Sequence, residues 1–98
     1  MDHRAIEFHP EAIAEARDAR EWYAERSSVA GDAFMAELDV AIDAICRSPH
    51  RWTTHLHHTR CYLMKRFPYM VVYRVTDEKL QVVAVAHGKR KPGYWRRR

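Results

Sequence analysis

Cysteine is scarce in this sequence. The 98 residues include only Cys46 and Cys61, with no Cys-x-x-Cys pair. Small folds that depend on a disulfide framework or a zinc site carry several cysteines at regular spacing. We therefore expect two free thiols in a reducing compartment. A hydrophobic content of 47% is enough for a modest core without disulfide bonds.

Long apolar runs are also missing. No stretch approaches the roughly 18 residues of a membrane span, and the N-terminal residues, Met1-Asp2-His3-Arg4, are polar. We expect neither a signal peptide nor a transmembrane helix, and hence a cytoplasmic protein with no membrane partner. The length suits one domain, which we predict to cover residues 1–98.

Acidic residues are nearly absent from the last part of the chain. Residues 1–59 carry 6 Lys and Arg against 11 Asp and Glu, whereas residues 60–98 carry 11 against 2. The two parts therefore have net charges of −5 and +9. Clustered Lys and Arg attract phosphates and acidic surfaces, so a polyanionic or acidic partner is expected there, with a solvated basic face as the alternative.

The first half of the sequence predicts a short strand and two helices. Ala5–Phe8 alternates apolar and polar residues, and Pro10 suits the first position of a helix that runs to Glu25. Its inner face is predicted to hold Ala12, Ala16, Ala19 and Tyr23, widened by Ile13 and Trp22. Ser27 or Ser28 can cap a second helix that stops at Pro49, with an apolar stripe of Phe34, Leu38, Ala41, Ile42 and Ile45. The short break predicts an antiparallel helical hairpin.

Three strands are expected after the hairpin, over Arg60–Phe67, Tyr69–Val75 and Lys79–Ala86. The gaps between them are too short for crossovers, so the strands should form an antiparallel meander. Met70-Val71-Val72-Tyr73 is almost wholly apolar, which indicates a strand covered on both faces. The helices can cover one face, and an apolar surface left on the other would be a docking site for another protein. The fold class is therefore α+β.

Four histidines, His50, His55, His57 and His58, fall in a segment without a clear periodic pattern. Histidine clusters can bind metals, but no carboxylate or cysteine lies within the segment. We expect a polar loop with no metal site, in which the histidines could also meet nucleic acid.

The basic tail after the last strand carries residues that could act on RNA. His87 could serve as base or acid, Lys89 and Arg90 could hold a phosphate, and Tyr94 or Trp95 could stack on a base. Gly88 and Gly93 allow sharp turns in the backbone. The alternative is that His87 is held by the backbone and that Tyr94 and Trp95 pack on the sheet edge. We expect the last three arginines, residues 96–98, to be disordered.

This element order resembles the RelE/ParE superfamily of toxins from type II toxin–antitoxin systems. The resemblance covers nearly the whole chain and includes the segments KRFPYMVVYR (residues 65–74) and VAHGKRKPGYW (residues 85–95). It implies a β-α-α-β-β-β microfold with a helical hairpin packed on a small, mainly antiparallel curved sheet. It also implies a small acidic antitoxin with a DNA-binding N-terminus, and operator DNA bound through the toxin–antitoxin complex.

The superfamily contains two mechanisms, neither of which uses a cofactor. RelE-like members are metal-independent endoribonucleases that cut mRNA on the ribosome, and ParE-like members inhibit DNA gyrase. In the nuclease case the candidate catalytic residues are His87, Arg90 and Tyr94, of which the resemblance matches Arg90 to the arginine after the last strand and Tyr94 to the tail tyrosine. In either case the candidates for nucleic-acid or target binding are Lys65, Arg66, Lys89, Lys91 and Trp95.

Two departures from the RelE-like pattern favour the ParE-like branch. Tyr69-Met70 stands where RelE-like toxins have an arginine, and their Lys-rich strand surface is reduced here to Lys65 and Arg66. The Phe67-Pro68-Tyr69 opening is also closer to ParE-like members. The preferred function is a gyrase-directed toxin that inhibits growth when free and is neutralised by an antitoxin. A RelE-like nuclease and an inactive module that binds nucleic acid or antitoxin remain as alternatives.

Overall fold

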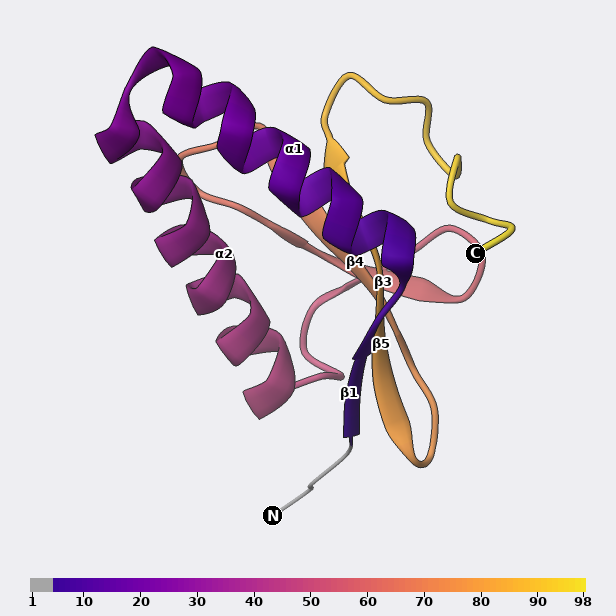
Figure 1. The fold of residues 1–98 in the computed structure, drawn as a ribbon. Coiled ribbons are helices and arrows are strands. Elements are labelled where there is room, and N and C mark those ends of the chain that lie inside the picture. The colour runs from indigo at the N-terminus through magenta and orange to yellow at the C-terminus, as the bar shows by residue number, and fades with distance from the viewer. Residues whose placement is uncertain (1–4) are drawn as a thin grey trace.

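The computed structural model describes residues 5–98 of the chain. Its elements, in order, are β1 (Ala5–Phe8), α1 (Pro10–Arg26), α2 (Ser28–Arg47), β2 (Thr53–His55), β3 (Thr59–Leu63), β4 (Tyr69–Val75) and β5 (Lys79–His87). Figure 1 shows both helices on one side of the sheet, and a C-terminal segment that leaves the end of β5 and returns past the β2–β3 hairpin. The α+β class and the predicted order of the longer elements are confirmed.

The helical hairpin forms as the sequence predicts. The Ser27 side chain accepts a hydrogen bond from the Ala30 N–H and so caps α2. The two helices approach so closely that a Cβ atom built on Gly31 would lie 2.8 Å from the Ala24 Cβ, so only glycine fits at this crossing. Neither helix of the described chain has both the length and the hydrophobicity to cross a bilayer.

The sheet has the strand order β1-β5-β4-β3-β2. β1 pairs with β5 in parallel and the other neighbours are antiparallel, so the predicted meander is confirmed. The short strand β2 was not predicted. Its three residues, Thr53–His55, are polar and mostly exposed, and only the pairing with β3 makes them a strand.

The strand predicted over Arg60–Phe67 is too long. β3 ends at Leu63 instead of Phe67, and the chain bends between Met64 and Pro68. The Met64 N–H donates to the Tyr69 carbonyl at 3.0 Å, which closes a hairpin onto β4. Pro68 has no N–H to continue a ladder. Apolar content alone therefore extended the prediction across a turn.

The main core lies between the helices and the sheet. Its buried side chains come from α1, α2 and the inner faces of β3, β4 and β5, with Phe34, Ile45, Val71, Tyr73 and Val82 all fully buried. The stripe predicted for α2 is buried apart from the partly buried Ile42. The prediction that Ile13 and Trp22 widen the buried face of α1 is wrong, because they are 49% and 50% exposed.

A second, smaller core occupies part of the opposite face of the sheet. Trp95 from the C-terminal segment packs there with Cys61, Val72, Val83, Ala84 and Ala86. The β4–β5 register is irregular at this point, because Tyr73 pairs with Val82 and Val72 with Ala84, which leaves Val83 as an extra residue on β5. This part of the second face is thus covered by the chain's own tail.

Candidate functional site

The C-terminal segment, residues 88–98, is a series of turns. The Gly88 N–H donates to the Pro68 carbonyl at 2.7 Å, which fixes the start of the segment against the β3–β4 turn. Arg96 and Arg98 donate their backbone N–H groups to the carbonyls three residues earlier, at 3.0 and 2.8 Å. Gly93 has a φ of 80°, a backbone conformation that other residues rarely adopt. The tail is therefore an ordered part of the fold.

Glu15 of α1 anchors this tail to the sheet. One carboxylate oxygen accepts the Val85 N–H at 3.0 Å and an Arg98 N–H at 2.8 Å. The other accepts the Tyr94 hydroxyl at 2.6 Å and a second Arg98 N–H at 3.1 Å. The Glu15 and Arg98 side chains are only 14% and 15% exposed. The predicted disorder of residues 96–98 is thus wrong for Arg98, which is held by a bidentate, largely buried ion pair.

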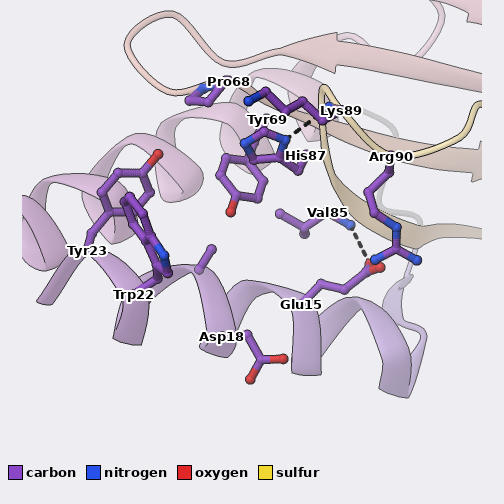
Figure 2. Close-up of a pocket in the computed structure, with 11 residues that line it drawn as sticks. Glu15, Asp18, Trp22, Tyr23, Pro68, Tyr69, Val85, His87, Lys89 and Arg90 are labelled. Carbon is purple, nitrogen blue, oxygen red and sulfur yellow. Dashed lines mark hydrogen bonds between the residues drawn. The ribbon is translucent and has the colours of Figure 1, made fainter. Parts of the chain in front are cut away.

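Local topology explains why a carboxylate is needed at this position. β1 pairs with β5 only as far as Val82, so the edge of β5 is open beyond that residue. The Val85 N–H would be left without a partner at this edge, and Glu15 supplies one. Figure 2 shows Glu15 reaching from α1 to Val85.

The contacts with Glu15 also determine the protonation states of Tyr94 and Arg98. Burial raises the pKa of Tyr94, and its hydrogen bond to the Glu15 carboxylate raises that pKa further, so the phenol is a neutral donor near pH 7. Burial lowers the pKa of Arg98, but the hydrogen bond and charge of Glu15 outweigh this effect and raise it. Both side chains are therefore committed to Glu15.

A groove of about 490 Å³ lies beside this anchor, between α1 and the ends of β4 and β5. We call it the tail groove. Its lining residues are Glu15, Asp18, Ala19, Trp22, Tyr23, Pro68, Tyr69, Val85, His87, Lys89 and Arg90. In Figure 2, Trp22 and Tyr23 lie at one end and Arg90 at the other, with His87 and Tyr69 between them.

The structure brings three of the predicted site residues together in this groove: His87, Lys89 and Arg90. The His87 Nδ1 atom accepts the Lys89 N–H at 3.0 Å, and the His87 ring meets Tyr69 edge-on at 5.0 Å between ring centroids. The Arg90 guanidinium lies 3.9 Å from the centroid of the Tyr94 ring, a cation–π contact that holds it beside the groove.

The other predicted residues lie elsewhere. Trp95 is 1% exposed and stacks on His55, so the prediction that it binds a target is wrong and the packing alternative is right. Lys91 lines a separate hollow with His57, Arg96 and Arg97. Lys65 and Arg66 occupy the β3–β4 turn, where Arg66 pairs with Glu37 at 2.8 Å. The two residues are not part of the tail groove.

Glu15 and Asp18 are the groove residues that sequence reasoning missed. Glu15 lies three residues after Ala12 and four before Ala19, both of which are buried. That spacing places it on the inward face of α1, and a carboxylate on an otherwise small apolar face requires a buried partner. The helical spacing was therefore a usable signal.

The arrangement of the histidines does not suggest a metal centre. Among residues 5–98, no group of three or more His, Cys, Asp and Glu side chains is placed to hold a metal ion. Cys46 and Cys61 are free thiols, and burial raises the pKa of both. Neither thiol lines the tail groove.

Known proteins with similar sequences and folds agree on one family. Residues 6–92 match the family model described as the ParE toxin of the type II toxin–antitoxin system, parDE. The chain is 33% identical over 55 residues to Toxin ParE2 from two strains of Mycobacterium tuberculosis, CDC 1551 / Oshkosh and ATCC 25618 / H37Rv. Each alignment covers 56% of this chain and 52% of the relative, so the chain spans about half the length of the curated relatives it matches.

The fold has a counterpart of known structure. A chain from the chromosomal ParDE toxin–antitoxin system of P. aeruginosa matches with a TM-score of 0.74 and 12% sequence identity. The match covers 86% of this chain and 95% of the other, which confirms the fold expected from the resemblance. Because the family model matches residues 6–92, the chain belongs to the ParE toxin family of type II toxin–antitoxin systems.

Proposed function

We propose that this protein is a growth-inhibitory toxin that acts on DNA gyrase in the cytoplasm and does not cleave mRNA. The observation that carries the choice of target is the commitment of Tyr94 to Glu15 at 2.6 Å. RNA cleavage through the 2′-hydroxyl requires a base, an acid and cations for the phosphorane charge. A phenol that donates to a buried carboxylate is poorly placed to supply any of these.

The charges in the tail groove support the same choice. Glu15 and Asp18 line it together with His87, Lys89 and Arg90, so carboxylates stand where an RNA phosphate would have to bind. Mixed charges and exposed aromatic rings, such as the half-exposed Trp22, suit a protein surface better than a phosphodiester. Lys89 and Arg90 are exposed beside these rings and form the proposed contact with the target.

The test is a parallel pair of assays on the purified protein. We expect inhibition of gyrase supercoiling and no cleavage of mRNA on translating ribosomes. Arg90→Ala should weaken inhibition, whereas Lys91→Ala, which changes a neighbouring exposed lysine outside the groove, should have little effect. Cleaved mRNA with unimpaired supercoiling would overturn the proposal. Normal growth during expression without a partner would favour an inactive binding module.

An antitoxin is the second part of the proposed function. A largely apolar groove of about 360 Å³ lies between α1 and α2 and is lined by side chains that include Ala12, Ile13, Ala16, Leu38 and Ile42. We call it the hairpin groove. Arg17 and Arg20 line it with Asp39, so an amphipathic segment of an acidic antitoxin is complementary to it. The apolar dock is thus proposed on the helices and not on the second sheet face.

Neutralisation of the toxin tests this surface. Ile13→Glu places a charge in the hairpin groove at a residue that is already 49% exposed, so the fold should tolerate it. We expect the co-expressed antitoxin to lose its ability to restore growth. Val29→Glu is the matched control, because Val29 is 74% exposed and lies outside that groove. Full rescue of the Ile13 variant would place antitoxin binding elsewhere.

A further inference from the structure

A cavity at the β2–β3 hairpin is lined by residues that have no part in the proposed toxin function. It has a volume of about 410 Å³ and is lined by His50, Thr54, His55, His58, Thr59, Arg60 and Val75. We call it the histidine pocket. It shares no lining residue with the tail groove or with the hairpin groove. Three imidazoles, one guanidinium and two hydroxyls line it, and no carboxylate does.

This set of side chains suits an anion. Arginine is always protonated and offers five N–H donors, and an imidazole offers one donor when neutral and two when protonated. Within residues 5–98 no three His, Cys, Asp or Glu side chains are placed to hold a metal ion, so the three histidines do not form a metal site. A phosphate group, with several acceptor oxygens, matches the available donors.

The walls of the pocket are held in place by hydrogen bonds. The Arg60 side chain donates to the Trp52 carbonyl at 2.7 Å, and Arg60 pairs in register with Thr54 across the hairpin. The hydroxyl of Tyr73, from β4, donates to the carbonyl of Pro49 at 2.6 Å, next to His50. The Arg60 side chain is therefore positioned before any ligand binds, which lowers the entropic cost of binding.

The turn between β2 and β3 shapes one wall of the pocket. It holds His57 and His58 at φ values of 58° and 62°, where glycine or asparagine is preferred. Two successive positive φ values are the geometry of tight β-hairpin turns, and the Thr59 N–H donates to the Leu56 carbonyl at 3.3 Å across this one.

The two histidines of this turn face different surroundings. His58 lines the histidine pocket, whereas the His57 ring lies against the tail, with its Nε2 atom 3.0 Å from the position of a Cβ built on Gly93. His57 accordingly has a packing role. The turn thus places one imidazole against the tail and the other at the pocket.

We propose that the histidine pocket binds a phosphate group through Arg60, His50 and His58, with the Thr54 hydroxyl as a further donor. The phosphate belongs either to a nucleic-acid backbone or to a free nucleotide or inorganic phosphate. Phosphate binding at this pocket does not depend on whether gyrase is the target.

The test is a titration of the full chain with inorganic phosphate, followed through the imidazole NMR signals. We expect the His50 and His58 signals to shift and saturate together. His58→Asn keeps a residue that tolerates positive φ and should weaken phosphate binding about tenfold, read from the His50 signal. His57→Asn makes the same change one residue earlier, outside the pocket, and should leave the affinity unchanged.

Arg60→Gln is the second variant, and its fold is checked by circular dichroism because Arg60 also supports the Trp52 carbonyl. A short DNA duplex and a nucleoside monophosphate, each titrated separately, distinguish the sources of the phosphate. Tighter binding of the duplex, lost in His58→Asn, identifies the backbone, whereas equal binding of the monophosphate identifies a small ligand. Unshifted His50 and His58 signals at saturating phosphate, or equal affinities of the two Asn variants, would overturn the proposal.

Discussion

Replacement of Glu15 by alanine tests the claim that this one side chain holds the tail in place. The carboxylate accepts four hydrogen bonds from three residues, Val85, Tyr94 and Arg98. Glu15→Ala leaves a largely buried guanidinium without its counter-charge and a strand N–H without its acceptor. Removing one member of a buried ion pair costs about 3–5 kcal/mol. The Arg98 and Glu15 side chains keep 15% and 14% of their exposure, so we expect the lower end, about 3 kcal/mol.

The loss should be visible in thermal and urea unfolding. For a domain of this size, about 3 kcal/mol corresponds to a fall in Tm of about 12–24 °C. Release of the tail should also speed tryptic cleavage after Arg96 and Arg97 under native conditions. A double-mutant cycle with Arg98→Ala separates the ion pair from the other contacts, because both single variants share the lost interaction.

Two control variants limit how the effect of Glu15→Ala can be explained. Glu21→Ala changes an exposed glutamate on the same helix and should shift stability by less than about 0.5 kcal/mol. Tyr94→Phe keeps the ring beneath Arg90 but removes the hydroxyl, and should cost about 1–2 kcal/mol. If Glu15→Ala unfolds like Glu21→Ala and its tail is cleaved no faster, the anchoring argument is wrong.

Two further predictions concern the core. Burial raises the pKa of Tyr73 to about 12, above the value of about 10 expected in the unfolded chain, so its contribution to stability is complete below pH 10 and is lost as the pH rises towards 12. Tyr73→Phe should flatten that part of the pH–stability curve, and an unchanged alkaline slope would count against burial as the cause. In Gly31→Ala the new Cβ meets Ala24 at 2.8 Å, so overpacking of about 1–3 kcal/mol should exceed the gain in helix propensity of about 1 kcal/mol. If Gly31→Ala stabilised the protein in urea unfolding, the two helices could move apart at this crossing without cost in free energy.

Local sequence patterns predicted most of the elements because they act between near neighbours. The helical spacing in α2, the cap at Ser27 and the nearly continuous apolar runs of β4 and β5 each depend on residues a few positions apart. The errors arose where a local pattern was ambiguous. Ile13 and Trp22 were placed in the core although α1 has small residues on its inner face, and β3 was extended to Phe67, into the turn that precedes Tyr69.

The site was predicted only in part. His87, Lys89 and Arg90 were identified from their position after a buried strand, and the structure does bring them to one groove. Trp95 was misassigned because the sequence does not show that the chain turns back at Gly93 and places the indole on the sheet. The histidine segment was predicted to be a polar loop, whereas Thr53–His55 form a strand, and its turn and its pocket were not visible in the sequence either.

The sequence by itself determined the element order, the helical hairpin and the gathering of positive charge behind the last strand. Only the tertiary structure decided that the tail is an ordered part of the fold and that Glu15 anchors it. The reason is distance along the chain, since Val85 and Arg98 lie 70 and 83 residues from Glu15. No periodicity or propensity connects such positions, and the folded sheet alone brings an open strand edge, a helix carboxylate and a terminal arginine to one point.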